Sequence, residues 1–177
     1  MRSVLIGTVL LLTMASYSTS EANWSVYLRH TGPLEVGMSL SDVRKVLSDP
    51  KAHLFSLELD DPKGVNGCSY LESMALPSKI SVMFNRQKIV RIDINEGSLF
   101  KTSSGIGIGD TEDRVKAVYG SRIRVEPHPY TDGHYLIYTP AEKSDREFGM
   151  IFETEEGRVT SFRAGLMSAV MLIEGCA

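Results

Sequence analysis

The chain has 177 residues, with 19 lysines and arginines against 22 aspartates and glutamates, which gives a net charge of -3. This length suits one compact domain, or two small ones that share a core. A mildly acidic chain without a run of basic residues argues against nucleic acid or anionic lipid as the main partner.

Residues 1–22 are predicted to be a cleavable secretory signal peptide. Arg2 precedes the apolar stretch 4–12, and small polar residues follow it, which is the order that signal peptidase reads. The stretch is shorter than the roughly 20 residues that span a bilayer. We therefore expect cleavage near Ala22, with Ala15 as an alternative, and no membrane span in the mature chain. The protein is then expected in the periplasm or secreted.

The two cysteines, Cys68 and Cys176, both lie after the predicted cleavage point. An even number of cysteines in an exported chain favours a disulfide between them. This bond would close a loop of about a hundred residues and contribute up to about 4–5 kcal/mol to stability. The alternative is two separate buried thiols. A nucleophilic cysteine is not expected, because an unpaired thiol would be exposed to oxidation outside the cytoplasm.

A weak internal repeat organises the rest of the chain. Segments 34–47 and 105–120 each place an apolar residue and a glycine, Gly37 or Gly109, before a helix start signal and apolar residues at helical spacing. The first helix is predicted to end at Asp49–Pro50, because proline cannot continue a helix.

The two predicted helices also share their capping chemistry. Ser39 is predicted to cap the first helix and Asp110 the second, and an acidic residue follows each cap at the third position (Asp42 or Asp113). The second helix is predicted to end at Gly120, because glycine is a common C-terminal cap.

After each predicted helix the apolar period changes to two, which is typical of strands. Two β-hairpins with polar turns are predicted, one from 79–84 and 88–94 and one from 148–153 and 158–163. Further strands are predicted at 53–59, 68–76, 123–126, 134–138 and 170–173.

These elements predict an α+β fold of two tandem repeats, each with short helices packed on an antiparallel β-sheet. The first repeat would cover residues 23–100 and the second 101–177. We expect the two to form one compact unit, because one helix and one thin sheet can hardly bury enough surface alone.

Two short motifs carry a family resemblance: Val36–Ser39 with Val43, and Ile108–Thr111 with Val115 and Gly120. They resemble the small lipoprotein subunit of the outer-membrane barrel-assembly machine and the tandem-repeat β-lactamase inhibitory proteins. The resemblance implies helices on one face of an antiparallel sheet; in the inhibitors, the open face and its loops grip a protein. The chain lacks a lipid-attachment cysteine, and its two cysteines would join the halves instead of lying within one repeat. Neither relative supplies a partner.

The most distinctive segment is 126–138, which combines histidines, tyrosines and an aspartate. Tyrosine and histidine present an apolar body and a polar tip, so we predict a protein-contact surface. The predicted contact residues are Tyr70, His128, Tyr130, Asp132, His134, Tyr135 and Tyr138. One alternative is that Tyr135 and Tyr138 simply pack on the sheet. Another is a zinc or copper site, for which a third or fourth ligand at a diagnostic spacing is lacking.

The sequence does not assemble a nucleophile, a base and an oxyanion site, and Gly105, Gly107 and Gly109 do not match a phosphate-binding loop. We therefore predict no catalytic residue, no metal and no cofactor. The leading hypothesis is a non-enzymatic periplasmic module that binds another envelope protein, as an inhibitor or immunity protein. The alternatives are an accessory factor in outer-membrane assembly, and a metal-binding protein or enzyme that uses His128 and His134.

Overall fold

The structure is a computed structural model that describes residues 24–47, 58–59, 67–72 and 76–176. The predicted signal peptide lies outside the described residues. So do the predicted helix end at Asp49–Pro50 and most of the predicted strand 53–59. Among the helices described, none is long and apolar enough to cross a membrane.

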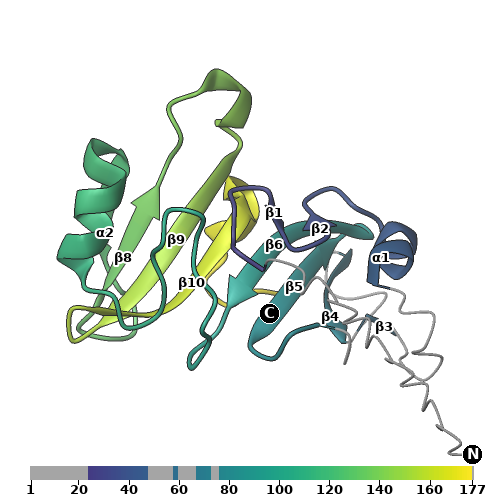
Figure 1. The fold of residues 1–177 in the computed structure, drawn as a ribbon, viewed down its shortest axis with the longest axis horizontal. Helices are drawn as coiled ribbons and strands as arrows, with labels where there is room; N and C mark the ends of the chain where they lie inside the picture. The colour runs from purple at the N-terminus through teal and green to yellow at the C-terminus, as the bar shows by residue number, and fades with distance from the viewer. Residues whose placement is uncertain (1–23, 48–57, 60–66, 73–75, 177) are drawn as a thin grey trace, which may run out of the picture.

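The protein is mostly β, and its main element is one antiparallel sheet of eight strands (Figure 1). The strand order is β3-β4-β5-β6-β10-β9-β8-β7, so two consecutive meanders meet where β6 pairs with β10. The strands are β3 (Glu58–Leu59), β4 (Cys68–Glu72), β5 (Ile80–Asn85), β6 (Lys88–Ile94), β7 (Ile123–Pro127), β8 (His134–Tyr138), β9 (Phe148–Glu155) and β10 (Arg158–Leu166).

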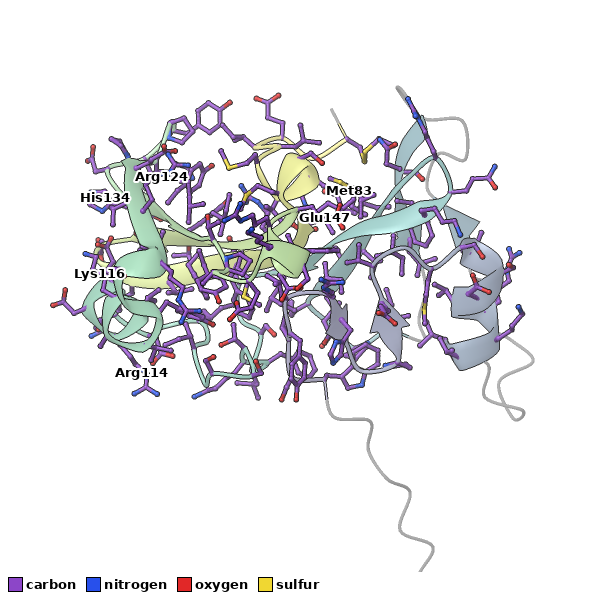
Figure 2. All side chains as sticks on the ribbon, turned by 90° about the horizontal axis from the view of Figure 1, so that it is seen from above. Met83, Arg114, Lys116, Arg124, His134 and Glu147 are labelled. Atoms are coloured by element: carbon purple, nitrogen blue, oxygen red, sulfur yellow. A yellow bond between two sulfur atoms is a disulfide. The ribbon has the colours of Figure 1, made fainter. Side chains whose placement is uncertain are left out.

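Short elements cover both faces of this sheet. Seen edge-on in Figure 2, α3 lies on one side of the sheet, whereas α1, α2 and the N-terminal hairpin lie on the other. The covering elements are β1 (His30–Thr31), β2 (Leu34–Glu35), α1 (Leu40–Leu47), α2 (Glu112–Tyr119) and α3 (Met167–Val170), with 3-10 turns at Gly120–Arg122 and Lys143–Asp145.

The prediction of an α+β fold built from two repeats is therefore wrong. The described helices are short, and α1 and α2 each bury one side chain fully, Val43 and Val115. Most of the buried apolar surface comes instead from the strands, which continue across the β6–β10 junction as one sheet. The helices thus cap a shared β core and do not form half of it.

The predicted hairpins are confirmed as β5–β6 and β9–β10, and 134–138 is confirmed as β8. The predicted last strand at 170–173 is wrong, because Val170 ends α3 and residues 171–173 lie in the turn that follows it. The Met171 N–H donates to the Met167 carbonyl at 3.1 Å, and Ala169 and Val170 are buried. A short apolar run does not distinguish a strand from a buried helical turn.

The helix starts agree with the prediction in one case and differ in the other. In α1, the Ser39 N–H donates to the Asp42 carboxylate at 3.0 Å and the Asp42 N–H donates to Ser39 Oγ at 3.3 Å, a reciprocal capping box. In α2 the cap is Thr111 and not Asp110, because Asp110 instead accepts the Gly107 N–H at 2.8 Å.

Glycine is required at the turn before each of these helices. Gly37 has φ 95° and Gly109 has φ 85°, a region that favours glycine because it lacks a Cβ. The Gly37 N–H donates to the Ile89 carbonyl in β6 at 2.8 Å, and the Gly109 N–H donates to the Val159 carbonyl in β10 at 2.8 Å. Each helix is thereby fixed to the last strand of the meander that follows it.

Candidate functional site

The face of the sheet that carries α3 is unusually rich in charge, and we call it the strap face. Arg91 and Asp93 project from β6 and Arg163 from β10, and Arg163 lies directly opposite Asp93. Glu153 lies on β9, next to Ser161 in the sheet register. Strand alternation places these polar side chains on one face and the apolar core of the same strands on the other.

The charges of the strap face are buried in ion pairs. Arg91 and Arg163 are only 3% and 5% exposed. Arg91 Nε lies 3.0 Å from the Asp93 carboxylate, and Arg163 pairs with Glu153. Burial raises the pKa of Asp93, against the opposing effect of the Arg91 guanidinium. Burying these charges is costly unless every one is paired, so this network demands a fixed geometry.

The last residues of the chain close over this network, and we call residues 171–176 the C-terminal strap. Arg91 Nη1 donates to the carbonyls of Ala169 at 2.9 Å and Leu172 at 2.8 Å, and Arg163 Nε donates to the Val170 carbonyl. These donors bind the carbonyls of Ala169 and Val170 at the end of α3 and of Leu172 just beyond it, and the Ala169 carbonyl also accepts the Leu172 N–H at 3.1 Å. The two arginines thus hold α3 and the start of the strap on the sheet.

The far end of the strap is fixed covalently. Cys68 and Cys176 form a disulfide with a Cα–Cα distance of 5.3 Å, which confirms the predicted pairing. Because Cys68 begins β4 and Cys176 ends the strap, the bond fastens the end of the strap to β4.

Four of the seven predicted contact residues lie on the strap face. Tyr70 accepts a hydrogen bond from Arg91 Nη2 at 2.7 Å. His128 packs its ring 4.6 Å from the Tyr135 ring, and the Arg163 guanidinium carbon lies 5.5 Å from the Tyr135 ring centre. Tyr135 is 5% exposed and packs on the sheet. The fourth, Tyr130, is different because it is 67% exposed.

The other three predicted residues lie off the strap face, although Asp132 and His134 line a hollow that Tyr130 also lines. His134 Nδ1 lies 2.8 Å from Glu112 of α2, on the side of the sheet away from the strap. Tyr138 packs against Tyr119 of α2 with ring centres 4.7 Å apart. Asp132 is exposed in the β7–β8 turn. The two histidines therefore have different partners.

Glu112 of α2 accepts hydrogen bonds from two strands and from its own helix. Burial raises its pKa, but hydrogen bonds from Thr154, His134 and Lys116 outweigh this and lower the pKa to about 2. Thr154 Oγ1 donates at 2.7 Å and Lys116 Nζ at 3.1 Å. This arrangement ties α2 to β8 and β9. Within the described part of the chain, no group of three histidines, cysteines or carboxylates could hold a metal ion.

The sequence predicts Tyr130 as a contact residue, but it indicates neither the arginine network nor the three exposed apolar residues beside Tyr130, which are Met171, Leu172 and Ile173. Tyr130 and these three consecutive strap residues form an exposed apolar surface, which we call the apolar ridge. Met171, Leu172 and Ile173 are 40%, 44% and 43% exposed. The Tyr130 hydroxyl donates to Glu174 at 2.8 Å and so joins the β7–β8 turn to the strap. That bond also raises the pKa of Tyr130.

Exposed apolar residues are common when they are scattered singly, but a contiguous group marks an interaction site. The ridge is such a group, since three of its members are adjacent in the chain and the fourth is hydrogen-bonded to the next strap residue. The strap that carries three of its members is held by the disulfide, by the bond from Arg91 to the Leu172 carbonyl and by the bond from Tyr130 to the Glu174 side chain. It therefore presents apolar area on a preformed surface.

No protein-family model matches the chain, and no curated protein matches it. One solved structure that it resembles is a cysteine-rich secretory protein from Staphylococcus aureus subsp. aureus Mu50, with 10% identity and a TM-score of 0.34. The match covers 75% of this chain and 45% of that protein, so the chain spans less than half of that protein's length. Similarity at this level does not assign a fold or a family.

Proposed function

We propose that this protein is a non-enzymatic binding module that works outside the cytoplasm and recognises another protein through the apolar ridge. The observation that carries this proposal is the exposure of Tyr130, Met171, Leu172 and Ile173 on a strap fastened by a disulfide. The predicted signal peptide and the disulfide support a periplasmic or secreted location. Inhibition of an envelope-acting enzyme is the sharpest form of the proposal.

The ridge has the properties of a binding hot spot. Tyrosine supplies a large, stiff contact area with few rotatable bonds, and it is enriched at hot spots. The strap is already ordered by three anchors, so binding a partner costs less conformational entropy than ordering a free tail would. Arg91, Arg163 and their carboxylate partners are paired internally, whereas the four apolar side chains of the ridge remain exposed to solvent.

Paired variants can test the proposal. Y130A/I173A removes two ridge side chains, and L99A/V118A removes two apolar side chains that are 92% and 42% exposed elsewhere. Each protein is immobilised and incubated with envelope extract from the source organism, and thermal melting checks that each is folded.

We expect wild type and L99A/V118A to retain the same partner, and Y130A/I173A to bind it at least about tenfold more weakly, since truncating a hot-spot residue commonly costs more than 1 kcal/mol. Equal retention by both variants would show that the ridge is not the contact surface. Failure of wild type to retain any protein would reject the binding function itself.

A further inference from the structure

The apolar ridge lies between two hollows, and the charge of the residues that line them indicates the kind of partner that the ridge would bind. On the β7–β8 side, a hollow of about 700 Å³ is lined by Tyr130 and by the turns of the two neighbouring hairpins. We call this the turn hollow. On the other side, a hollow of about 440 Å³ is lined by the arginine network together with Ile173 and Glu174. We call this the network hollow.

The turn hollow presents negative charge. Glu112, Asp132, Glu155 and Glu156 line it, and no lysine or arginine does so among the described residues; His134 also lines it, with its Nδ1 2.8 Å from the Glu112 carboxylate. Glu112 already accepts hydrogen bonds from Lys116 and Thr154. Asp132, Glu155 and Glu156 are exposed in the turns, so these three carboxylates face whatever approaches Tyr130 from this side.

The network hollow also presents negative charge at its mouth, although two arginines line it. Arg91 and Arg163 are almost completely buried, and Asp93 and Glu153 neutralise them. Glu174 is exposed and lies on the strap itself, where Tyr130 donates to it. The charge available to a partner is therefore a carboxylate here too.

We propose that the partner presents a basic segment to this surface: an apolar side chain that packs on Tyr130 and Ile173, with lysine or arginine on either side. This inference rests on the proposed function, because it names the chemistry of the partner that the ridge binds. The ridge supplies the apolar anchor, and the carboxylates in both hollows supply charge complementarity, which speeds association and selects the partner. An acidic partner would place like charges together, which is unfavourable.

The test uses a charge variant and a matched control. D132N/E155Q/E174Q neutralises three exposed carboxylates around the ridge, and the side-chain amide oxygen that E174Q introduces can still accept the Tyr130 hydrogen bond. E35Q/D113N/E142Q neutralises three exposed carboxylates that line neither hollow. The probes are two short blocked peptides, Lys-Leu-Lys and Glu-Leu-Glu, titrated into the isotope-labelled full mature protein and followed by NMR.

We expect Lys-Leu-Lys to shift the amide signals of Tyr130, Ile173 and Glu174, and to bind D132N/E155Q/E174Q about tenfold more weakly than wild type. This fold-change assumes a small contribution from each exposed charge pair. The control variant should bind as wild type does, and added salt should weaken binding.

Glu-Leu-Glu binding as tightly as Lys-Leu-Lys, or equal Lys-Leu-Lys affinity for the two triple variants, would overturn the inference. So would the absence of shifts at the ridge with Lys-Leu-Lys. These outcomes would not affect the proposed function if, in the capture experiment, Y130A/I173A still bound the partner more weakly than wild type. Failure of that capture experiment would instead remove the protein-binding role itself.

Discussion

Removing the disulfide should cost a large part of the stability of the protein. The bond joins residues that are 108 positions apart. In the chain-entropy model, closing a loop of this length removes about 16 cal/mol/K from the unfolded chain, or about 4.8 kcal/mol at 25 °C. Small domains are stable by only about 5–15 kcal/mol. C68A/C176A should therefore unfold at a much lower denaturant concentration than wild type.

Removal of the disulfide should change the folded structure only near the end of the strap. Arg91 and Arg163 would still hold the end of α3, because their bonds to Ala169, Val170 and Leu172 do not depend on the disulfide. The strap beyond Leu172 would keep only the Tyr130–Glu174 hydrogen bond among the contacts named above. Hydrogen exchange should therefore rise most in residues 173–176.

Urea unfolding of C68A/C176A beside oxidised wild type measures the stability change. Wild type reduced with a dithiol is the matched control, since it breaks the same bond without removing either sulfur. A loss below about 1 kcal/mol in both samples would refute the reasoning, because it would mean that the cross-link does little to constrain the unfolded chain.

Three further changes test the way the elements are held. E112Q should lower the free energy of unfolding at pH 7 by about 1–3 kcal/mol. Because folding lowers the pKa of Glu112 from 4.5 to about 2, the contribution of this carboxylate is present above pH 4.5 and is lost as pH falls toward 2. Urea unfolding of wild type and E112Q at several pH values would contradict the account if the stabilities of the two proteins declined in parallel over this range. T111A should cost about 1 kcal/mol of stability through loss of the α2 cap, whereas D110A should leave the cap bond from the Arg114 N–H to Thr111 intact. If T111A and D110A lost the same hydrogen-exchange protection in α2, Thr111 would not be the cap. G165A should destabilise the protein by more than about 2 kcal/mol. Gly165 has φ +146°, and a Cβ there would lie 2.3 Å from the Val90 carbonyl oxygen at the β6–β10 junction. An unchanged melting temperature of G165A would show that this contact can relax.

The elements that follow from local patterns could be predicted from the sequence. The β5–β6 and β9–β10 hairpins alternate apolar and polar residues, and this alternation sets which face each residue occupies. The Cys68–Cys176 disulfide followed from an even number of cysteines in an exported chain. The Thr111 cap was missed by one residue, because Asp110 and Thr111 both have side-chain oxygens that can cap a helix.

The features that depend on long-range packing could not be predicted. Nothing local in β6 or β10 indicates that they pair with each other and merge the two meanders into one sheet. Arg91 and Arg163 alternate with apolar residues, as charges on a solvent-exposed face do, and only the return of residues 167–176 over that face buries them.

Only part of the candidate site could be predicted, because the rest of it also depends on long-range packing. The 126–138 segment correctly attracted attention to Tyr130, which the structure leaves exposed. His134 and Tyr138 alternate onto the α2 side of the sheet, which strand geometry places opposite to Tyr135. The ridge residues Met171, Leu172 and Ile173 read as a strand in the sequence, so their exposure was not foreseen.

Site-specific cross-linking tests the central claim, that the apolar ridge is a protein-binding surface, most directly. A photoreactive phenylalanine analogue would replace Tyr130 in one protein and Leu99, which is 92% exposed in a loop away from the ridge, in another. After irradiation in intact envelopes, we predict a cross-linked adduct of defined mass from position 130 and none from position 99. An adduct from position 99 alone, or none from position 130, would contradict the account.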